Sequence, residues 1–140
     1  MGVRVQLMSW QEAQALAAPI RFAIFVDEQN VPAGIELDDM DEKSLHAIAF
    51  DEAGKAIGTG RLLPEGKIGR MAVVKEWRRR GIGVEILQAL IAEARRRGHA
   101  DVVVSAQLQA AEFYREQGFA AEGKVYPEAG ILHQKMRKKL

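Results

Sequence analysis

The amino-acid sequence of 140 residues contains no cysteine. This absence excludes disulfide bonds, thiolate metal sites and a cysteine nucleophile, and it does not indicate a redox compartment. No apolar run approaches the roughly 18 residues that a membrane-spanning helix needs. The opening segment, MGVRVQLMSW, also lacks the apolar core of a secretory signal. We therefore expect a soluble, cytoplasmic protein with no membrane partner.

Aromatic residues and net charge are both low. Aromatic residues make up 6% of the chain, and 20 Lys and Arg nearly balance 19 Asp and Glu, which leaves a formal net charge of +1. A nucleic-acid-binding surface is usually basic and uses aromatic stacking. The basic runs at 78–80, 95–97 and 137–139 keep a nucleic-acid-binding module open as an alternative. The overall balance nevertheless predicts no nucleic-acid partner.

Hydrophobic periodicity predicts seven strands and four helices within one domain, residues 1–140. Their order is strand, two helices, three strands, helix, strand, helix and two strands. Strands are expected near 3–7, 45–51, 56–64, 67–74, 101–106, 119–126 and 131–137; helices are expected over 10–29 with a break at Pro19, from Gly83 onward, and over 108–117. This order predicts an α+β fold with one parallel strand–helix–strand step.

The segment WRRRGIG, residues 77–83, stands between a predicted strand and a predicted helix. Free N–H groups and the positive dipole end at a helix start attract anions. The glycines Gly81 and Gly83 let the backbone approach a phosphate closely, and three arginines add positive charge. A Walker loop does not fit because no Gly-Lys-Ser/Thr string occurs. A dinucleotide loop would need a third glycine where this chain has Ile86.

The pattern Arg78-x-x-Gly81-x-Gly83 is similar to the acyl-CoA-binding signature of the GNAT superfamily of N-acyltransferases. The segment AAEFYREQGF (110–119) resembles the family's helix that carries Phe-Tyr before Gly-Phe. RFAIFVDEQNVP, ELDDMD, the strand with His46 and GILHQKM resemble one bacterial branch of uncertain substrate. The likeness covers nearly the whole chain. It implies a mixed, mostly antiparallel sheet of about seven strands with about four helices, and splayed parallel strands at the CoA site.

The resemblance also implies how the co-substrate acetyl-CoA would bind, without a metal. Backbone groups before the loop would contact the pantetheine arm, backbone N–H groups of the loop would hold the pyrophosphate, and arginines would reach the adenosine phosphates. Gln107 occupies a position where many members carry a pantetheine-binding Asn. The implied cofactor-binding residues are Met71, Ala72, Val73, Arg78, Arg79, Arg80, Gly81, Ile82, Gly83, Val84 and Gln107.

The resemblance suggests Tyr114 as the general acid that protonates the leaving thiolate. The alternative is a tyrosine that only packs in the core. Many members place a glutamate on the strand before the loop as general base, but this chain has Ile68-Gly69-Arg70 there. Glu28, Asp38 and His133 are the candidates for a base or an acceptor-site residue, and an ordered water is another. We expect His46 to be structural.

Residues 36–42 form an acidic segment that is read either as a solvated loop or as a wall of the acceptor pocket that attracts a cationic amine. We expect an N-acetyltransferase that acts on a small amine or a peptide. Direct attack in a ternary complex is favoured because there is no cysteine and Ser105 has no evident base. A catalytically weak acyl-CoA-binding sensor or scaffold is the alternative, and the prediction allows a homodimer.

Overall fold

The computed structural model describes residues 2–140, apart from the side chain of Ile35. Its strands are β1 (Arg4–Met8), β2 (Leu45–Phe50), β3 (Ala56–Leu62), β4 (Lys67–Val73), β5 (Asp101–Gln107), β6 (Ala120–Glu128) and β7 (Ile131–Lys139). Its helices are α1 (Trp10–Arg21), η1 (Phe22–Glu28), α2 (Ala33–Glu36), η2 (Lys75–Trp77), α3 (Ile82–Arg96), η3 (Leu108–Ala110) and α4 (Ala111–Glu116). Among these helices none is long and apolar enough to cross a lipid bilayer. The order of strands and major helices agrees with the prediction.

One seven-stranded sheet runs through the molecule in the order β1-β2-β3-β4-β5-β7-β6. Neighbouring strands are antiparallel except β4 and β5, which are parallel. That parallel pairing holds only at Lys67 with Val103 and Ile68 with Val104. The expected mixed, mostly antiparallel α+β fold is therefore confirmed, and its two central strands separate after one short stretch of pairing.

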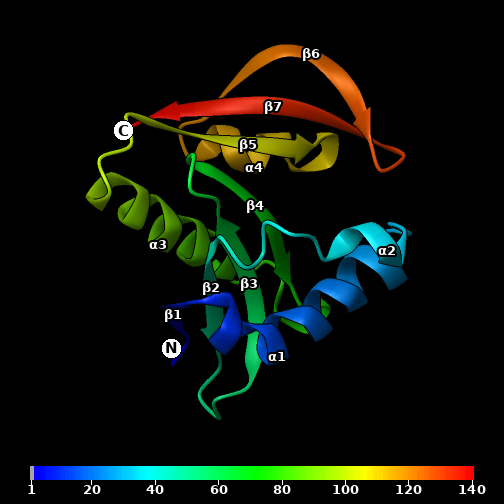
Figure 1. The fold of residues 1–140 in the computed structure, drawn as a ribbon, viewed down its shortest axis with the longest axis vertical. Helices are drawn as coiled ribbons and strands as arrows, with labels where there is room; N and C mark the ends of the chain where they lie inside the picture. Colours follow the sequence, from blue (N-terminus) through cyan, green and yellow to red (C-terminus); the bar gives the residue numbers. More distant parts are fainter. Residues whose placement is uncertain (1) are drawn as a thin grey trace.

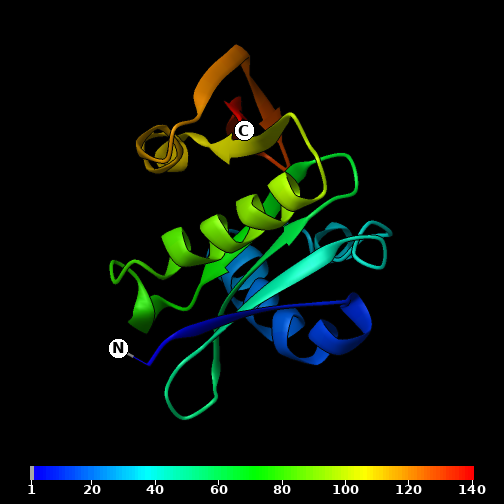
Figure 2. The same ribbon diagram turned by 90° about the vertical axis from the view of Figure 1, so that its left-hand side faces the viewer.

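Helices α1 and α3 lie on opposite faces of the first four strands (Figures 1 and 2). Alternation along β2 explains both contacts, because successive side chains of a strand point to opposite faces. Ala47 and Ala49 belong to the core that includes α3, whereas Ile48 and Phe50 pack in the core beneath α1. Helix α4 lies beside β5, near the other end of the sheet (Figure 1).

Helix α3 has clear start and stop signals in the sequence. Gly81 caps its N-terminus with a left-handed backbone, φ 80°, which glycine adopts without a steric penalty. Ile82, Ile86 and Leu90 follow at a spacing of four residues and are buried against the sheet. Gly98, with φ 86°, follows the last turn as predicted.

The break predicted at Pro19 is wrong. Helix α1 continues through Pro19 to Arg21 and is followed directly by the π-helical segment η1. Proline removes one backbone donor and crowds the preceding turn, but a helix can absorb such a disturbance by changing its winding locally. This π-helical segment includes Phe25, which lines the cavity described below.

Candidate functional site

Strand β4 bends away from β5 at a bulge. Thr59 pairs with Ala72 and Arg61 with Gly69, so that the single residue between them on β3 faces two residues, Arg70 and Met71, on β4. Arg70 has a left-handed backbone, φ 49°, which is uncommon for a residue other than glycine. A bulge of this kind bends and twists its strand. The bulge therefore accounts for the early end of the β4–β5 pairing.

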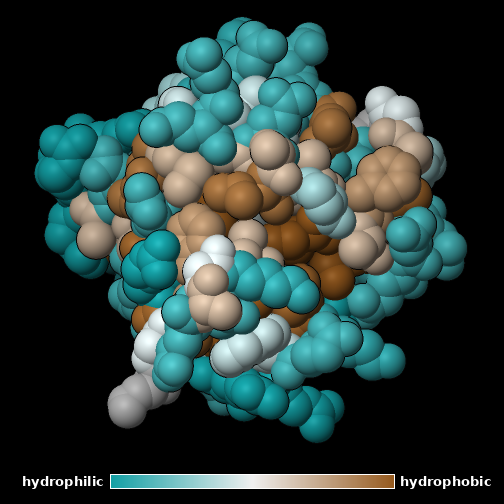
Figure 3. All heavy atoms as spheres, turned by 90° about the horizontal axis from the view of Figure 1, so that it is seen from below, coloured by the Kyte–Doolittle hydropathy of each residue, from teal (hydrophilic) through white to brown (hydrophobic). Residues whose placement is uncertain are grey.

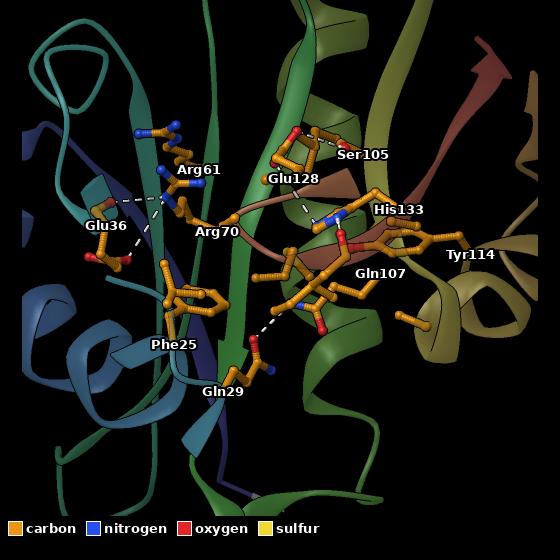
Figure 4. A pocket seen from close by; sticks show the side chains of 18 of the residues that line it. Phe25, Gln29, Glu36, Arg61, Arg70, Ser105, Gln107, Tyr114, Glu128 and His133 are labelled. Atoms are coloured by element: carbon orange, nitrogen blue, oxygen red, sulfur yellow. Dashed lines mark hydrogen bonds and ion pairs between the residues drawn. The ribbon is translucent and has the colours of Figure 1, made fainter. Parts of the chain in front are cut away.

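A cavity of about 660 Å³ lies where β4 and β5 separate. On one side of it are Phe25, Glu36, Arg61 and Arg70, and on the other Ser105, Gln107, Tyr114 and His133 (Figure 4). Gln107 Nε2 donates a hydrogen bond of 2.7 Å to Gln29 Oε1 and so links the end of β5 to the end of η1. The cavity thus receives side chains from η1, both central strands, α4 and β7.

The N-terminus of α3 offers backbone donors beside this region. Glu85 N–H donates to the Gly81 carbonyl at 3.1 Å, so the N–H groups of Ile82, Gly83 and Val84 precede the helical hydrogen-bonding pattern. A β-carbon at Gly81 would meet nothing within 4 Å, and one at Gly83 would lie 3.5 Å from the Phe113 ring. The loop surface is therefore open enough for a phosphate to approach the main chain, and these residues fit an acyl-CoA diphosphate.

The three arginines of the loop have different surroundings. Arg78 Nη1 and Nη2 each lie 2.8 Å from a carboxylate oxygen of Glu28, and Arg78 Nε donates to the Val73 carbonyl at 3.0 Å. The Arg80 guanidinium lies 4.9 Å from the Trp77 ring centroid, and Arg79 and Arg80 are exposed. Arg78 is thus ion-paired with the last residue of η1, whereas Arg79 and Arg80 lie just before the start of α3.

Tyr114 is buried at the cavity. Its ring makes edge-to-face contacts with Phe113 and Phe119, with centroid distances of 5.1 and 5.5 Å. Burial raises the pKa of the Tyr114 phenol to about 12. Tyr114 also lines the cavity, so core packing and a role at the site are compatible. A phenol with this pKa stays protonated at neutral pH and can donate a hydrogen bond.

His133 is held in one orientation on β7. Its Nδ1 lies 2.7 Å from the Ile131 carbonyl oxygen, which can only accept a hydrogen bond. Nδ1 therefore carries the hydrogen of the neutral ring, and Nε2 keeps its lone pair. Nε2 lies 4.0 Å from Glu128 Oε2, and the ring stacks on Tyr126 at a centroid distance of 6.0 Å. The imidazole can accept a proton at Nε2 beside a carboxylate.

Glu28 and Asp38 are both engaged in ion pairs. Hydrogen bonding from Arg78 lowers the pKa of the Glu28 carboxyl. Burial opposes ionisation of Asp38, but Arg61 and Arg70 outweigh it and hold the Asp38 pKa below its usual value. Among the described residues that line the cavity, neither of these carboxylates is present. Of the three base candidates, the structure brings only His133 to the cavity.

The acidic segment is solvated only in part. Glu36 and Asp41 are each 1% exposed, and both bind Arg21, with Nε–Oε1 and Nη1–Oδ1 distances of 2.7 Å. Arg61 Nη1 lies 2.8 Å from Asp41 Oδ1. Desolvation of these groups would be very costly without such pairing. The solvated-loop interpretation is wrong for Glu36 and Asp41, because arginines from distant parts of the chain neutralise them.

His46 belongs to this buried network, as expected for a structural histidine. Its Nε2 donates to the Asp41 carbonyl at 2.8 Å, and its ring lies 4.8 Å from Trp10. Sequence reasoning missed the network itself and the carboxylate of Glu128 beside His133. No spacing signal could have revealed either group, since each is assembled from separate elements.

The surface and the ionisable groups suggest which chemistry the site can support. Seen from below Figure 1, hydrophobic side chains gather at the centre of the face and hydrophilic ones surround them (Figure 3). Within residues 2–140, no group of three or more histidine or carboxylate side chains is arranged to hold a metal ion. The site combines a helix start with free backbone N–H groups, a cavity between separated strands, a protonated phenol and an oriented imidazole. These groups suit acid–base chemistry on a phosphate-containing donor.

Comparisons with known proteins agree with this geometry. Residues 12–140 match the family described as "Acetyltransferase (GNAT) domain". The chain is 37% identical over 123 residues to Uncharacterized N-acetyltransferase YjcF of Bacillus subtilis, which covers 85% of this chain and 87% of that protein. An acyl-CoA N-acyltransferase structure from Pseudomonas aeruginosa has a TM-score of 0.86 at 27% identity, over 98% of this chain and 99% of that one. Escherichia coli ElaA shares the fold, with a TM-score of 0.86 at 23% identity over 97% of this chain and 99% of that one. The chain therefore belongs to the GNAT family of acetyltransferases.

Proposed function

We propose that this protein transfers an acetyl group from acetyl-CoA to a primary amine, by direct attack of the amine while both substrates are bound. The observation that carries the proposal is the cavity at the β4–β5 separation, which Tyr114 and His133 both line. The open N-terminus of α3 would give the donor a second attachment point beside it. Holding two substrates in a reactive orientation can supply about 7–11 kcal/mol of the barrier reduction.

The donor would be held mainly by backbone groups. Acetyl-CoA supplies an acyl group activated as a thioester, with a thiol as the leaving group. The main chain of Met71–Val73 would bind the pantetheine arm, and the N–H groups of 79–84 would bind the diphosphate. Arg79 and Arg80 are the exposed guanidinium groups beside that loop. Each charge-assisted hydrogen bond to a phosphate would contribute about 1.5–3 kcal/mol.

Two side chains would move the protons. Nε2 of His133 would accept a proton from the amine, and the Glu128 carboxylate would stabilise the imidazolium that forms. Tyr114 would donate a hydrogen bond or a proton to the departing sulfur. The raised pKa keeps the phenol protonated over the whole neutral range, which suits hydrogen-bond donation to the sulfur, and it makes the phenol a weaker acid. Each group would act from its position in the cavity without a covalent acyl-enzyme.

The direct test is a thiol-release assay with acetyl-CoA and a panel of polyamines, amino sugars, amino acids and peptides. We expect release that depends on one class of amine and yields its N-acetylated product by mass spectrometry. Propionyl-CoA and longer acyl-CoAs in parallel would define the donor. Tight CoA binding with no product from any amine would contradict acetyl transfer and favour an acyl-CoA-binding sensor.

A further inference from the structure

A second hollow continues the cavity along the same face of the sheet. It measures about 360 Å³ and is lined by residues of β4, β5, β6 and β7. Lys67 and Ser105 line both spaces, so the two adjoin. Lys67 neighbours Ile68, which is buried in the core shared with α3, and therefore points to the opposite face. An acceptor that enters the cavity has room to extend past Ser105 towards Lys67.

Lys67 differs from the other cations around these two spaces. Arg61 is paired with Asp38 and Asp41, Arg70 with Asp38, Arg78 with Glu28, and Lys135 with Glu122, at N–O distances from 2.7 to 3.2 Å. For Lys67, no carboxylate of residues 2–140 lies within ion-pair distance. Glu65 lines the second hollow without pairing to it. One lysine charge is therefore available to a ligand.

The opposite end of this path carries negative charge. Glu128 lies 4.0 Å from Nε2 of His133, and its Oε1 accepts a hydrogen bond of 3.4 Å from Ser105. An amine approaching His133 would meet this carboxylate. The path from His133 to Lys67 therefore runs from a carboxylate to an unpaired ammonium group, which matches a ligand with an amine at one end and an anion at the other.

Strand geometry sets the length of such a ligand. His133 is paired with Gln107, and Lys67 with Val103, four residues earlier on β5. Four residues of strand span about 13 Å, and β7 and β4 lie two strands apart, about 10 Å across the sheet, so the two Cα atoms are about 16 Å apart. An extended lysine side chain reaches about 6 Å from its Cα, and its hydrogen bond to the anion covers about 3 Å more. The spacing between amine and anion is then about 7–13 Å, depending on the direction of that side chain. An α-amino acid, with its two groups about 3 Å apart, is too short.

We propose that the acceptor is an amine that carries a carboxylate or phosphate about 7–13 Å from the nitrogen, and that Lys67 binds this anionic group. This inference rests on the proposed acyl transfer and names the class of its acceptor. Glu128 and His133 face the amine, and Lys67 sets the preference for a long anionic tail over a neutral tail.

The test compares amines of one length with and without an anion. Glycine, γ-aminobutyrate and ε-aminocaproate form the carboxylate series, an ω-aminohexyl phosphate is the phosphate arm, and hexylamine is the neutral control. The variants are Lys67→Gln, Lys67→Arg and Lys43→Gln, since Lys43 is an exposed lysine that lines neither space. We expect kcat/KM to be about tenfold higher for ε-aminocaproate or the phosphate than for hexylamine, the size of one charge-assisted bond. Lys67→Gln should remove that ratio, and the other two variants should keep it.

Binding separates this inference from the proposed function. Calorimetric titration of the CoA-loaded protein with ε-aminocaproate and hexylamine measures recognition of the anion even if no acetyl group is transferred. Binding of the acid that weakens about tenfold in Lys67→Gln would support the site, whether or not turnover occurs. A wild-type protein that shows no preference for the acid over hexylamine, or a preference that survives in Lys67→Gln, would overturn it.

Discussion

His133 and Glu128 face each other at the β6–β7 turn, with 4.0 Å between Nε2 and Oε2. The pair sits at the edge of the cavity, and the Ile131 carbonyl fixes the ring through Nδ1. The resemblance implies a base on β4, where this chain has Ile68-Gly69-Arg70. We propose that His133 takes that role from β7, a strand two places away in the sheet.

Replacing His133 by Asn should lower kcat by about a hundredfold or more, the usual contribution of a general base. The amide cannot accept a proton but can still donate to the Ile131 carbonyl. The dissociation constant for CoA should stay within about twofold, because the proposed donor contacts are with residues 71–73 and 79–84. Thiol-release kinetics and calorimetry measure the two quantities. His99→Asn is the control, and unchanged kcat in His133→Asn would remove His133 from its role.

Tyr114→Phe should also reduce kcat strongly while the protein keeps its fold and its CoA affinity. The change deletes one hydroxyl and leaves both edge-to-face ring contacts in place. Because burial raises the Tyr114 pKa to about 12, wild-type activity should show no loss from phenol ionisation below about pH 10. Measuring kcat as a function of pH up to about pH 10, for the wild type and Tyr114→Phe, tests both expectations. A variant as active as the wild type would leave Tyr114 a packing residue.

Substitutions of the loop arginines should affect different substrates, CoA for Arg80 and the acceptor for Arg78. Arg80→Gln should raise the CoA dissociation constant about tenfold, because it removes a guanidinium group that we propose binds phosphate. Arg78→Gln should affect CoA less and raise the acceptor KM instead, since it frees the end of η1 from its ion pair with Glu28. Arg95→Gln, an exposed change at the far end of α3, is the matched control. An equal loss of CoA affinity in the Arg78 and Arg80 variants would contradict this division.

The lowered pKa of buried His46 should make the stability of the protein depend on pH. Burial lowers its pKa below the usual 6.5. The unfolded chain therefore binds this proton at a higher pH than the folded chain does. The free energy of unfolding should fall as pH decreases below about 6.5, by at most about 1.4 kcal/mol per pH unit, until the folded pKa is passed. Urea unfolding between about pH 7.5 and 5.5 measures the slope. It should be smaller in His46→Gln, and an identical slope would refute the assignment.

The sequence was informative where one residue or one local period decides the structure. Gly98 marked the end of α3, alternation marked β1, and an unbroken β-branched run marked β5. It was misleading at Pro19, where a purely local rule ignored the packing that keeps the chain helical to Glu28. It could not reveal that Arg21, Arg61 and Arg70 meet the acidic segment, because charge pairing over such separations depends on the finished fold. The sequence also could not reveal that Glu128 lies beside His133, because the pairing of β6 with β7 brings them together.

A crystal structure of the protein with acetyl-CoA tests the central claim most directly. We expect the diphosphate on the backbone N–H groups of 79–84, and the acetyl group in the gap between β4 and β5, facing Tyr114 and His133. A donor bound elsewhere, with that gap filled by the protein's own side chains, would contradict it.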